Sequence, residues 1–545
     1  MTEPDTTPRG AAAPDHEFIV VGTGVCGIYQ LYQLLRIGAD VVALDAHADL
    51  GGTWFKNRYP GCRFDSESYT YGYSFSDELL QEWNWSENFA AQPETLRYLN
   101  HVADKFGLRE HMVFNTRVSA ARFDDEAGLW RLKVDDGRVL TCRFLLTAVG
   151  LLSIPTPPRI PGMDSFRGVS MHTYDWPDER LDLTGQRVAV IGAGASGIQV
   201  IASIADKVES LTVLQRRPNW AAPLNNSPIS EDEMAKIKAS YEEIFARCDE
   251  TPGGFVHGPD RHKFAEATPE ERRELWEKLY RAPGFGIWLG NLRDVLTDET
   301  ANEAFSAFVA EKIRERVKDP RTAELLIPKD HGFGVQRVPL ETNYYEAFNR
   351  DNVELVSLSE TPIEEITPSG LRTTDREYEF DVIVYATGFD AITGAYDHID
   401  IVGRDGLRLK DAWADGPVTY LGIQVVGFPN LLMLAGVHTA SVATNAPRAI
   451  EAEVNWITQL IEHMRAHAYT RIETTEEAQG WWTARIKELY GRLLLRKARS
   501  WFTGYNANVA GHDRTRYLLY VGGAPRYRTA LEEVSENGYE GFVLS

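Results

Sequence analysis

The chain contains two copies of the glycine pattern GxGxxG, and each copy lies between an apolar run and a helix-like segment. The glycines are Gly22, Gly24 and Gly27 in the first copy, and Gly192, Gly194 and Gly197, with Ser196 between them, in the second. In this setting the pattern is typical of a Rossmann unit, whose helix N-terminus binds a pyrophosphate. One copy alone often marks only a tight turn, but two copies in the correct context predict two dinucleotide sites. We therefore predict an α/β fold with two Rossmann-like dinucleotide-binding domains.

The residues that close the next strand of each unit differ in charge. Asp45 ends the apolar strand 41–44 about 20 residues beyond the first glycine pattern, where a carboxylate accepts hydrogen bonds from ribose hydroxyls. Arg216 and Arg217 end the strand 211–215 at the matching place, where guanidinium groups bind a 2′-phosphate. The acidic residue at the end of the first strand predicts FAD at the first site, and the two arginines at the end of the second predict NADPH at the second site. Such a chain would transfer electrons from nicotinamide to flavin.

Length and charge set the class of protein. A chain of 545 residues is long enough for two or three domains with large cores. Its net charge of −22 disfavours nucleic acid or an anionic membrane as a partner, because both would repel the average surface. No apolar run approaches the length of a membrane span. We expect a small-molecule enzyme that is a monomer or a weak homo-oligomer.

The N-terminus and the cysteines indicate the compartment. Residues 1–15 are rich in Pro, Thr and Ala, which predicts a disordered tail and not a signal peptide. The four cysteines contain no CxxC pair, which disfavours a dithiol redox centre or a zinc site and favours buried thiols in a reducing, cytoplasmic setting; they are Cys26, Cys62, Cys142 and Cys248. No metal is expected.

A helical segment interrupts the strand pattern of the second Rossmann unit. Capping boxes at Ser230 and Thr268 and a third start near Asp298 predict helices between about 227 and 331. Apolar strands return at 352–357 and 382–385. The predicted division is a tail at 1–15, an FAD-binding domain at 16–150 and 385–545, an NADP-binding domain at 151–226 and 332–384, and a helical insertion at 227–331.

Further motifs surround the two glycine patterns. One run holds Phe166, Gly168, His172, Thr173, Trp176, Pro177 and Asp178, a second holds Gly52, Trp54, Tyr59, Pro60, Gly61 and Asp65, and a third is Ala386-Thr387-Gly388. Together they resemble the type I Baeyer–Villiger monooxygenases, over about residues 18–501. The resemblance implies FAD, NADPH and a flavin C4a-peroxide that inserts one oxygen atom of O2 beside a ketone carbonyl, giving an ester or lactone.

The resemblance also implies the catalytic residues. The family places an arginine beside the peroxide, and its segment resembles 334–339, which makes Arg337 the candidate. A fixed cation would stabilise both the anionic peroxide and the anionic adduct with the ketone. The family pairs this arginine with the aspartate that is Asp65 here, whose carboxylate would orient the guanidinium. The alternative is an ordinary surface ion pair.

The remaining candidates concern cofactors and substrate. The resemblance implies that Gly52, Thr53, Trp54 and Asp65 contact FAD and that Trp501 contacts NADP, although Trp501 is equally well explained as a core residue. Many members have a lysine that helps to hold the 2′-phosphate where this chain has the neutral Gln336, so the chain departs from the family pattern at the NADPH site. His172 is expected to couple domains and not to transfer protons. In loop 435–441, expected at the substrate pocket, His438 faces the ketone or caps the following helix.

Other functions remain open at this point. A flavin monooxygenase that oxidises sulfur or nitrogen shares the twin Rossmann plan, as does a redox-sensing binding protein that has lost turnover. Disulfide reductases also share it but need a close cysteine pair. The general likeness favours a bulky alicyclic or terpenoid ketone as substrate.

Overall fold

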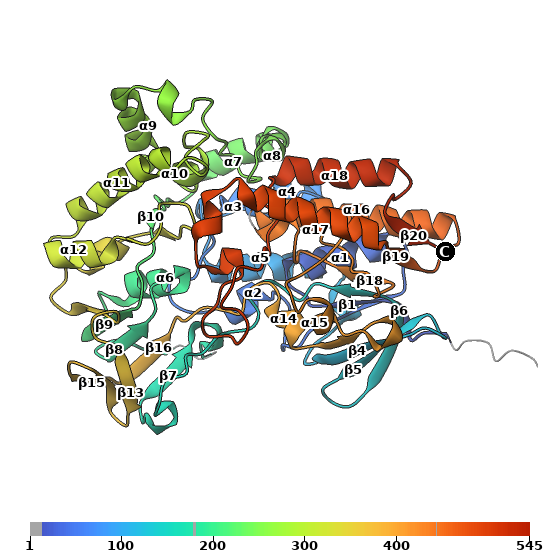
Figure 1. The fold of residues 1–545 in the computed structure, drawn as a ribbon, viewed down its shortest axis with the longest axis horizontal. Helices are drawn as coiled ribbons and strands as arrows, with labels where there is room; N and C mark the ends of the chain where they lie inside the picture. The colour runs from blue at the N-terminus through green and yellow to red at the C-terminus, as the bar shows by residue number, and fades with distance from the viewer. Residues whose placement is uncertain (1–12, 178–180, 443) are drawn as a thin grey trace, which may run out of the picture.

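The computed structural model describes residues 13–177, 181–442 and 444–545. Most of the predicted tail at 1–15 and Asp178 lie outside the described residues. Two sheets lie in the lower half of Figure 1, the first on the right and the second on the left, and helices lie above both. The mixed α/β class predicted from the sequence is confirmed.

The first sheet carries the first glycine pattern. It has eight strands in the order β17-β4-β5-β6-β1-β2-β3, and β18 pairs with β6. β1 lies between β2 and β6 and is parallel to both, and helix α1 follows it. Their bounds are β1 His16–Val21, α1 Val25–Arg36, β2 Val41–Leu44, β3 Met112–Val113, β4 Val118–Asp124, β5 Leu129–Val134, β6 Val139–Thr147, β17 Asp400–Val402 and β18 Leu431–Met433. The expected strands at 18–21 and 41–44 are confirmed.

The second sheet carries the second glycine pattern. Its five strands are all parallel, in the order β12-β9-β8-β16-β7, and helix α6 follows β8. A three-stranded antiparallel sheet, β13-β14-β15, follows β12 in the chain. The bounds are β7 Val169–His172, β8 Arg187–Ile191, α6 Ala195–Ile204, β9 Ser210–Gln215, β12 Val353–Ser357, β13 Ile363–Thr367, β14 Gly370–Thr373, β15 Glu377–Glu379 and β16 Val382–Tyr385. β16 is a buried inner strand, as its continuous apolar run predicts.

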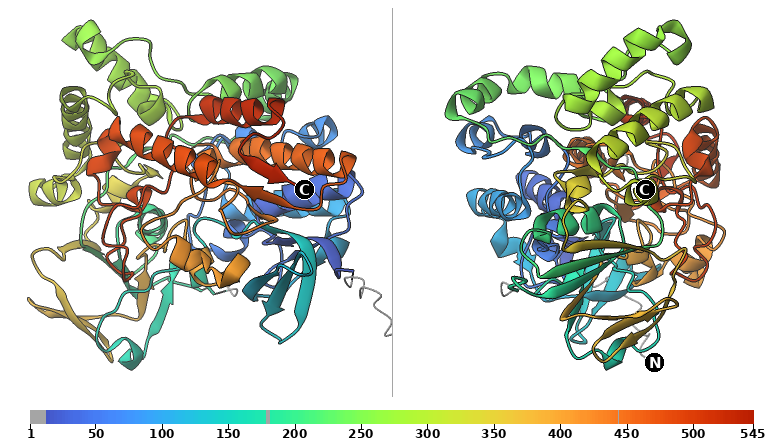
Figure 2. Two further views of the ribbon diagram at one scale, coloured as in Figure 1. Left: turned by 45° about the vertical axis from the view of Figure 1, so that its right-hand side comes forward. Right: turned by 90° about the vertical axis from the view of Figure 1, so that its left-hand side faces the viewer.

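The segment between β10 and β11 is helical, as predicted. Both capping boxes form, at Ser230 with Glu233 and at Thr268 with Glu271, and Asp298 caps the third predicted helix. The views in Figure 2 place these green and yellow-green helices at the top, away from the strands of both sheets. Their bounds are β10 Ala222–Pro223, α7 Glu231–Ala239, α8 Tyr241–Glu250, η4 Phe264–Glu266, α9 Pro269–Arg281, α10 Gly286–Leu289, α11 Glu299–Arg316, α12 Pro320–Leu326 and β11 Leu340–Glu341.

After β16 the chain returns to the first sheet through β17 and β18 and then forms the C-terminal helices. Helix α16 packs on α1, the helix that follows the first glycine pattern. These later elements are α14 Gly394–Asp397, α15 Leu409–Ala412, α16 Ala446–Ala466, β19 Ile472–Thr474, α17 Glu476–Gly491, α18 Ala524–Glu536 and β20 Phe542–Leu544. The earlier short helices are α2 Thr53–Lys56, α3 Ser68–Tyr71, α4 Asp77–Glu82, α5 Gln92–Lys105 and α13 Tyr344–Ala347.

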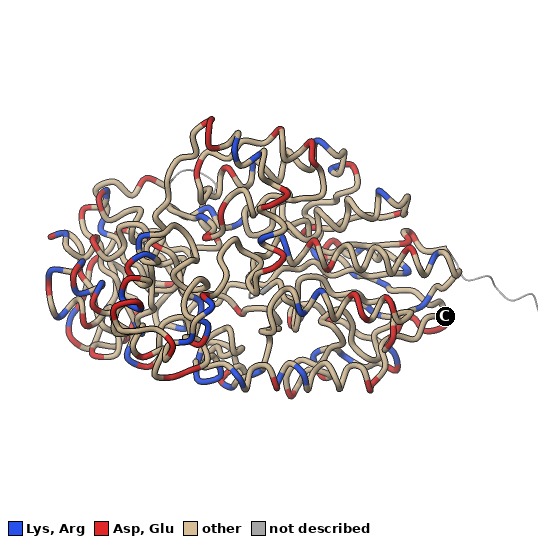
Figure 3. Tube along the Cα trace, turned by 90° about the horizontal axis from the view of Figure 1, so that it is seen from above, with Lys and Arg blue, Asp and Glu red and all other residues tan. Residues whose placement is uncertain are grey.

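Charged residues of both signs are interspersed along the trace, without a large basic face (Figure 3). None of the helices in the described residues is both long and apolar enough to cross a bilayer. The four cysteines are free and buried, as expected of small apolar side chains.

Candidate active site

The first glycine pattern forms a tight loop between β1 and α1. Gly22 has a φ of 106°, and a Cβ there would lie 2.3 Å from the carbonyl oxygen of Ala148. A Cβ at Gly27 would lie 1.8 Å from the carbonyl oxygen of Gly22, so the loop excludes larger residues. Gly24 gives α1 no side-chain cap, which leaves the N-terminal N–H groups of the helix open to an anion.

The segment Gly52-Thr53-Trp54 lies against this loop. A Cβ at Gly52 would come within 2.9 Å of the Cα of Gly24. Thr53 is the first residue of α2, and the indole N–H of Trp54 donates to the hydroxyl of Tyr71 at 3.0 Å. The structure therefore brings together two motifs that the sequence assigned to one cofactor.

Asp45 also reaches the first glycine loop, at the end of β2. Its buried carboxylate accepts hydrogen bonds from the backbone N–H and the hydroxyl of Thr23, both at 2.8 Å, and from the N–H of His47 at 2.9 Å. A carboxylate offers about four acceptor positions, so one remains for a ribose hydroxyl. The contact with Thr23, which fixes the loop on β2, was not predicted.

The second glycine pattern opens into a cavity of about 510 Å³. A Cβ at Gly194 would meet no atom within 4 Å, so the N-terminus of α6 is accessible to a large ligand. Among the residues that line this coenzyme cavity are the predicted Gly192, Gly194, Arg216, Arg217, Gln336, Arg337 and Trp501. The seven candidates come from segments that are far apart in the sequence, and they share one cavity.

The two candidate phosphate-binding arginines differ in their contacts. Arg217 forms an ion pair with Asp330 at 3.4 Å and donates to the carbonyl oxygen of Arg499 at 3.1 Å. Arg216 is exposed and lines the same cavity. Because Arg217 is already engaged by a carboxylate, Arg216 is the better placed of the two to bind a phosphate group.

Arg337 and Asp65 form the ion pair that the sequence analysis expected. The Nη2 atom of Arg337 lies 2.7 Å from Oδ2 of Asp65, and the side chains are 29% and 6% exposed. The guanidinium also stacks on the ring of Phe285 at 4.9 Å and donates to the carbonyl oxygen of Val338. A buried carboxylate and an aromatic ring hold this cation more firmly than a surface pair would.

Comparisons with known proteins agree with this geometry. A family model described as pyridine nucleotide-disulphide oxidoreductase matches residues 19–252. The chain is 46% identical to 2-oxo-Δ3-4,5,5-trimethylcyclopentenylacetyl-CoA monooxygenase of Pseudomonas putida, over 98% of this chain and 99% of that protein. It is 38% identical to a Baeyer–Villiger monooxygenase of Pseudooceanicola batsensis, over 97% and 96%, and 40% identical to a phenazine N-monooxygenase of Lysobacter antibioticus, over 96% of each chain.

The crystal structure of OTEMO in complex with FAD and NADP matches at 46% identity with a TM-score of 0.94, over 98% of this chain and 100% of that chain. The chain belongs to the Baeyer–Villiger monooxygenase family. Twin Rossmann-type domains follow from this membership. The disulphide chemistry in the description of the family model does not, because the four cysteines are separate, free and buried.

The run that precedes the second glycine pattern has a structural place in this Baeyer–Villiger monooxygenase. His172 ends β7, pairs with Tyr385 of β16, and stacks edge-on against Phe389, just beyond the Ala386–Gly388 turn. Its Nδ1 accepts the N–H of Tyr174 at 3.1 Å, and burial lowers the pKa of the imidazole. These contacts favour a link between segments over proton transfer. Gly168 lies against the ring of Phe166 and the carbonyl oxygen of Asp381. Trp176 and Pro177 line a separate cavity of about 400 Å³.

His438 does not cap the following helix, which was one of the two alternatives in the sequence analysis. Its side chain is fully buried, with Nδ1 3.0 Å from the hydroxyl of Thr419 and Nε2 2.8 Å from the carbonyl oxygen of Tyr517. Asn445, not His438, precedes α16 at the cap position. Burial lowers the pKa of His438 to about 4, so the ring stays neutral and joins loop 435–441 to the chain near 517.

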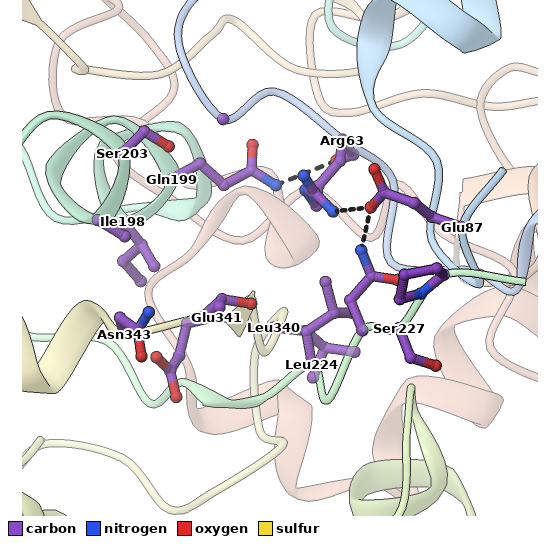
Figure 4. Close-up of a pocket in the computed structure, with 15 residues that line it drawn as sticks. Arg63, Glu87, Ile198, Gln199, Ser203, Leu224, Ser227, Leu340, Glu341 and Asn343 are labelled. Atoms are coloured by element: carbon purple, nitrogen blue, oxygen red, sulfur yellow. Dashed lines mark hydrogen bonds and ion pairs between the residues drawn. The ribbon is translucent and has the colours of Figure 1, made fainter.

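Three segments meet at helix α6, which follows the second glycine pattern; Figure 4 shows Gln199 of this helix beside Arg63 and Glu87. One turn into α6, the amide of Gln199 donates to the carbonyl oxygen of Arg63 at 3.0 Å and accepts from the hydroxyl of Tyr59 at 2.9 Å. Arg63 pairs in turn with Glu87 at 3.0 Å, beside a cavity of about 420 Å³. The helix at the second dinucleotide site is thereby fixed to the loop that carries Asp65.

Several residues at the site escaped the sequence analysis. Phe285 stacks on Arg337, and Asn219 and His331 hydrogen-bond to Gln336. No local pattern marks them, since each becomes relevant only through a contact across the fold. The sequence Arg216-Arg217-Pro218-Asn219-Trp220 could at most have placed Asn219 near the arginine pair.

A cluster of two aspartates and a histidine begins at Asp390, directly after Phe389 of the coenzyme cavity. In the described residues, Asp390, Asp397 and His512 have ligand atoms within 4.8 Å of one another. The guanidinium of Arg516 lies 2.9 Å from His512, so a positive charge is already present there. A metal site is not needed to explain the cluster.

Proposed function

We propose that this chain is an FAD-containing, NADPH-dependent Baeyer–Villiger monooxygenase that converts a ketone to an ester or lactone with O2. The observation that carries the proposal is the Arg337–Asp65 pair, at 2.7 Å, on the same cavity as the second glycine pattern. A fixed cation beside the place where negative charge develops on oxygen is what oxygen insertion beside a carbonyl requires.

The first glycine loop fits FAD. The residues that would hold it are Gly22, Gly24 and Gly27 at the pyrophosphate, Asp45 at the ribose, and the segment 52–54 beside the loop. The close contact of Gly52 with Gly24 leaves backbone, not side chain, facing the expected pyrophosphate. Matching structures contain FAD and NADP, which supports the assignment.

The coenzyme cavity fits NADPH. The N-terminus of α6, with Gly194 open to the cavity and Ser196 in its first turn, would bind the pyrophosphate. Arg216 and Arg217 would bind the 2′-phosphate, and Gln336 would add a neutral hydrogen bond. Trp501 lines the cavity from the C-terminal part of the chain.

The residues near Arg337 would act by orientation and charge. Bound FAD, once reduced by NADPH, supplies the activated oxygen derived from O2. Arg337 would stabilise the negative charge that develops on oxygen as the ketone reacts. Asp65 would hold the guanidinium through a charge-assisted hydrogen bond, and the ring of Phe285 would fix its plane. His172 would remain neutral and outside the chemistry.

The substrate is best described as an alicyclic ketone. The name of the Pseudomonas putida relative contains a trimethylcyclopentenyl ring, which agrees with the expectation from the sequence. The test is a panel of cyclic, bulky alicyclic and linear ketones, with NADPH consumption measured and products identified. Esters or lactones from the alicyclic members support the proposal. Consumption without any oxygenated product would refute it.

A second candidate function is the oxidation of nitrogen or sulfur, because one relative is a phenazine N-monooxygenase at 40% identity. A phenazine and a thioether added to the same panel separate the two functions. Turnover confined to the heteroatom substrates would favour the second candidate.

We further assign residues 16–150 and 385–545 to the FAD-binding domain, 151–226 and 332–384 to the NADP-binding domain, and 227–331 to the helical insertion. The return of the chain to the first sheet at β17 and β18 supports this division. Limited proteolysis with and without the two cofactors tests it, since each cofactor should protect its own domain.

A further inference from the structure

A chain of polar contacts connects Arg217 with the backbone of Arg337. Asp330 pairs with Arg217 at 3.4 Å and lies 2.7 Å from Nδ1 of His331. Nε2 of His331 lies 2.9 Å from the amide nitrogen of Gln336, which also donates to Asn219 at 2.9 Å. The side-chain amide of Asn219 then donates to the carbonyl oxygen of Arg337 at 3.3 Å. His331 is the titratable group in the middle of this chain.

These contacts define the protonation state of His331. Because an amide N–H of Gln336 points at Nε2, that nitrogen accepts a hydrogen bond and carries no proton. The remaining proton is on Nδ1 and is donated to Asp330. This hydrogen bond is the main reason why the pKa of Asp330 is lowered. In this arrangement Nε2 of His331 faces a donor and Nδ1 faces a carboxylate.

The position of His331 brings it close to many charges. Its side chain is only 7% exposed, its carbonyl oxygen accepts the indole N–H of Trp220 at 2.9 Å, and it lies between the coenzyme cavity and a second cavity of about 510 Å³. The charged groups that line the coenzyme cavity are Arg216, Arg217, Arg337 and Arg499. Those that line the second cavity are Glu299, Glu303, Arg314, Lys329, Asp330 and Lys497.

We propose that His331 determines coenzyme preference by taking up one proton when the 2′-phosphate of NADPH or NADP+ binds. The inference rests on the proposed use of NADPH. A dianion added to the cavity favours the charged form of a neighbouring imidazole. The proton comes from solvent, no covalent bond changes, and the amide of Gln336 rotates so that its oxygen accepts the new N–H. His331 then supplies, from behind Gln336, the positive charge for the 2′-phosphate that the neutral Gln336 cannot supply.

Proton counting by calorimetry tests the proposal on the FAD-loaded enzyme. NADP+ and NAD+ are titrated near pH 7.5 in two buffers of different ionisation enthalpy. A free phosphate monoester, with a second pKa of about 6, is almost fully ionised there, so any extra protons taken up from the buffer are bound by the protein. Binding of NADP+ should be accompanied by the uptake of a fraction of a proton more than binding of NAD+, because the added dianion favours the protonated imidazole.

The His331→Gln variant should lose this extra uptake. It should also bind NADP+ about three- to ten-fold more weakly near pH 7 with NAD+ unchanged, as expected for a lost interaction with a charged group. Gln336→Lys should abolish the uptake while keeping NADP+ affinity, because a fixed cation replaces the proton. Lys329→Gln is the matched control, since Lys329 lines only the second cavity and pairs with Glu324. It should behave as the wild type.

Two results with the His331→Gln variant would overturn the proposal. One is wild-type proton uptake in His331→Gln, and the other is an equal loss of NADP+ and NAD+ binding in that variant, which marks a structural role. NADP+ binding without extra uptake in the wild type also rejects it and leaves the proposed function intact. Only the absence of NADP+ binding to the FAD-loaded chain would reject both.

Discussion

At the scale of single residues, the site depends on how Arg337 is held. Asp65, Phe285 and the carbonyl oxygen of Val338 contact the guanidinium from different sides. The Oδ1 atom of Asp65 is buried without a hydrogen-bond partner among the described residues, so the carboxylate has little reason to be there except for the arginine. Burial of this ion pair costs desolvation free energy. That cost is easier to explain if the pair has a function than if it only supports the fold.

Arg337→Ala should leave reduction of FAD by NADPH intact and stop ester formation. Hydride transfer does not need this cation, whereas loss of one charge-stabilising group typically lowers turnover about 100- to 1,000-fold. Stopped-flow traces of flavin absorbance, together with product yield per NADPH, check the prediction. Asp65→Ala should give a similar but milder loss. An unchanged yield in Arg337→Ala would show that this arginine is misassigned.

Arg216→Ala should weaken NADPH binding about ten- to a hundred-fold and spare NADH, because a hydrogen bond between charged groups contributes about 1.5–3 kcal/mol. Arg217→Ala should have the smaller effect, since Asp330 already engages Arg217. KM for both coenzymes at fixed ionic strength provides the comparison. If Arg216→Ala weakens both coenzymes equally, the 2′-phosphate is bound elsewhere.

At the scale of elements, α16 carries a buried acid beneath loop 435–441. Glu453 is 1% exposed, and its Oε1 accepts the backbone N–H of Ala435 at 2.9 Å. Ala435 has a φ of 49°, an unusual value for a residue other than glycine. Burial raises the pKa of Glu453 from its ordinary 4.5 to about 8, so the group is protonated at neutral pH. The helix thereby fixes a strained turn of this loop.

Glu453→Gln should flatten the dependence of stability on pH. Because the folded pKa of Glu453 lies above the unfolded value, the folded chain binds the extra proton between about pH 4.5 and 8. The free energy of unfolding therefore falls as pH rises through that window, by at most about 1.4 kcal/mol per pH unit for one group. Glutamine keeps the acceptor for Ala435 but cannot ionise.

Denaturant unfolding of the holoenzyme at several pH values between 5 and 8.5 measures this difference. Glu462→Gln, an exposed position on the same helix, is the matched control and should retain the wild-type slope. Equal slopes for the wild type and Glu453→Gln would mean that Glu453 is ionised in the folded chain.

The elements were largely predictable from the sequence, and the contacts between them were not. The strands at 188–191 and 382–385 are apolar throughout because they are buried on both faces, and Ser230 and Thr268 mark helix starts by local hydrogen bonds. The approach of Arg337 to Asp65 could be expected only through resemblance to a family. His438 was misread because its partners lie 19 and 79 residues away in the chain.

At the scale of the whole molecule, the coenzyme cavity is lined by segments that are far apart in the chain. It is lined by the second sheet, by the segment 331–339 that follows the helical insertion, by the turn at 386–389, and by the C-terminal residues 499–508. The chain returns to the first sheet between these segments, as the colours in Figure 1 make visible. The site therefore exists only in the complete fold, which explains why no single motif reveals it.

The most direct test of the account is a turnover with isotopically labelled O2. The FAD-loaded chain is mixed with NADPH and an alicyclic ketone under heavy-oxygen gas, and the product is analysed by mass spectrometry. We predict an ester or lactone that carries one labelled oxygen atom in the ring or chain position and the unlabelled ketone oxygen in the carbonyl. Consumption of NADPH that yields only hydrogen peroxide and unchanged ketone, in the wild type as in Arg337→Ala, would contradict the account.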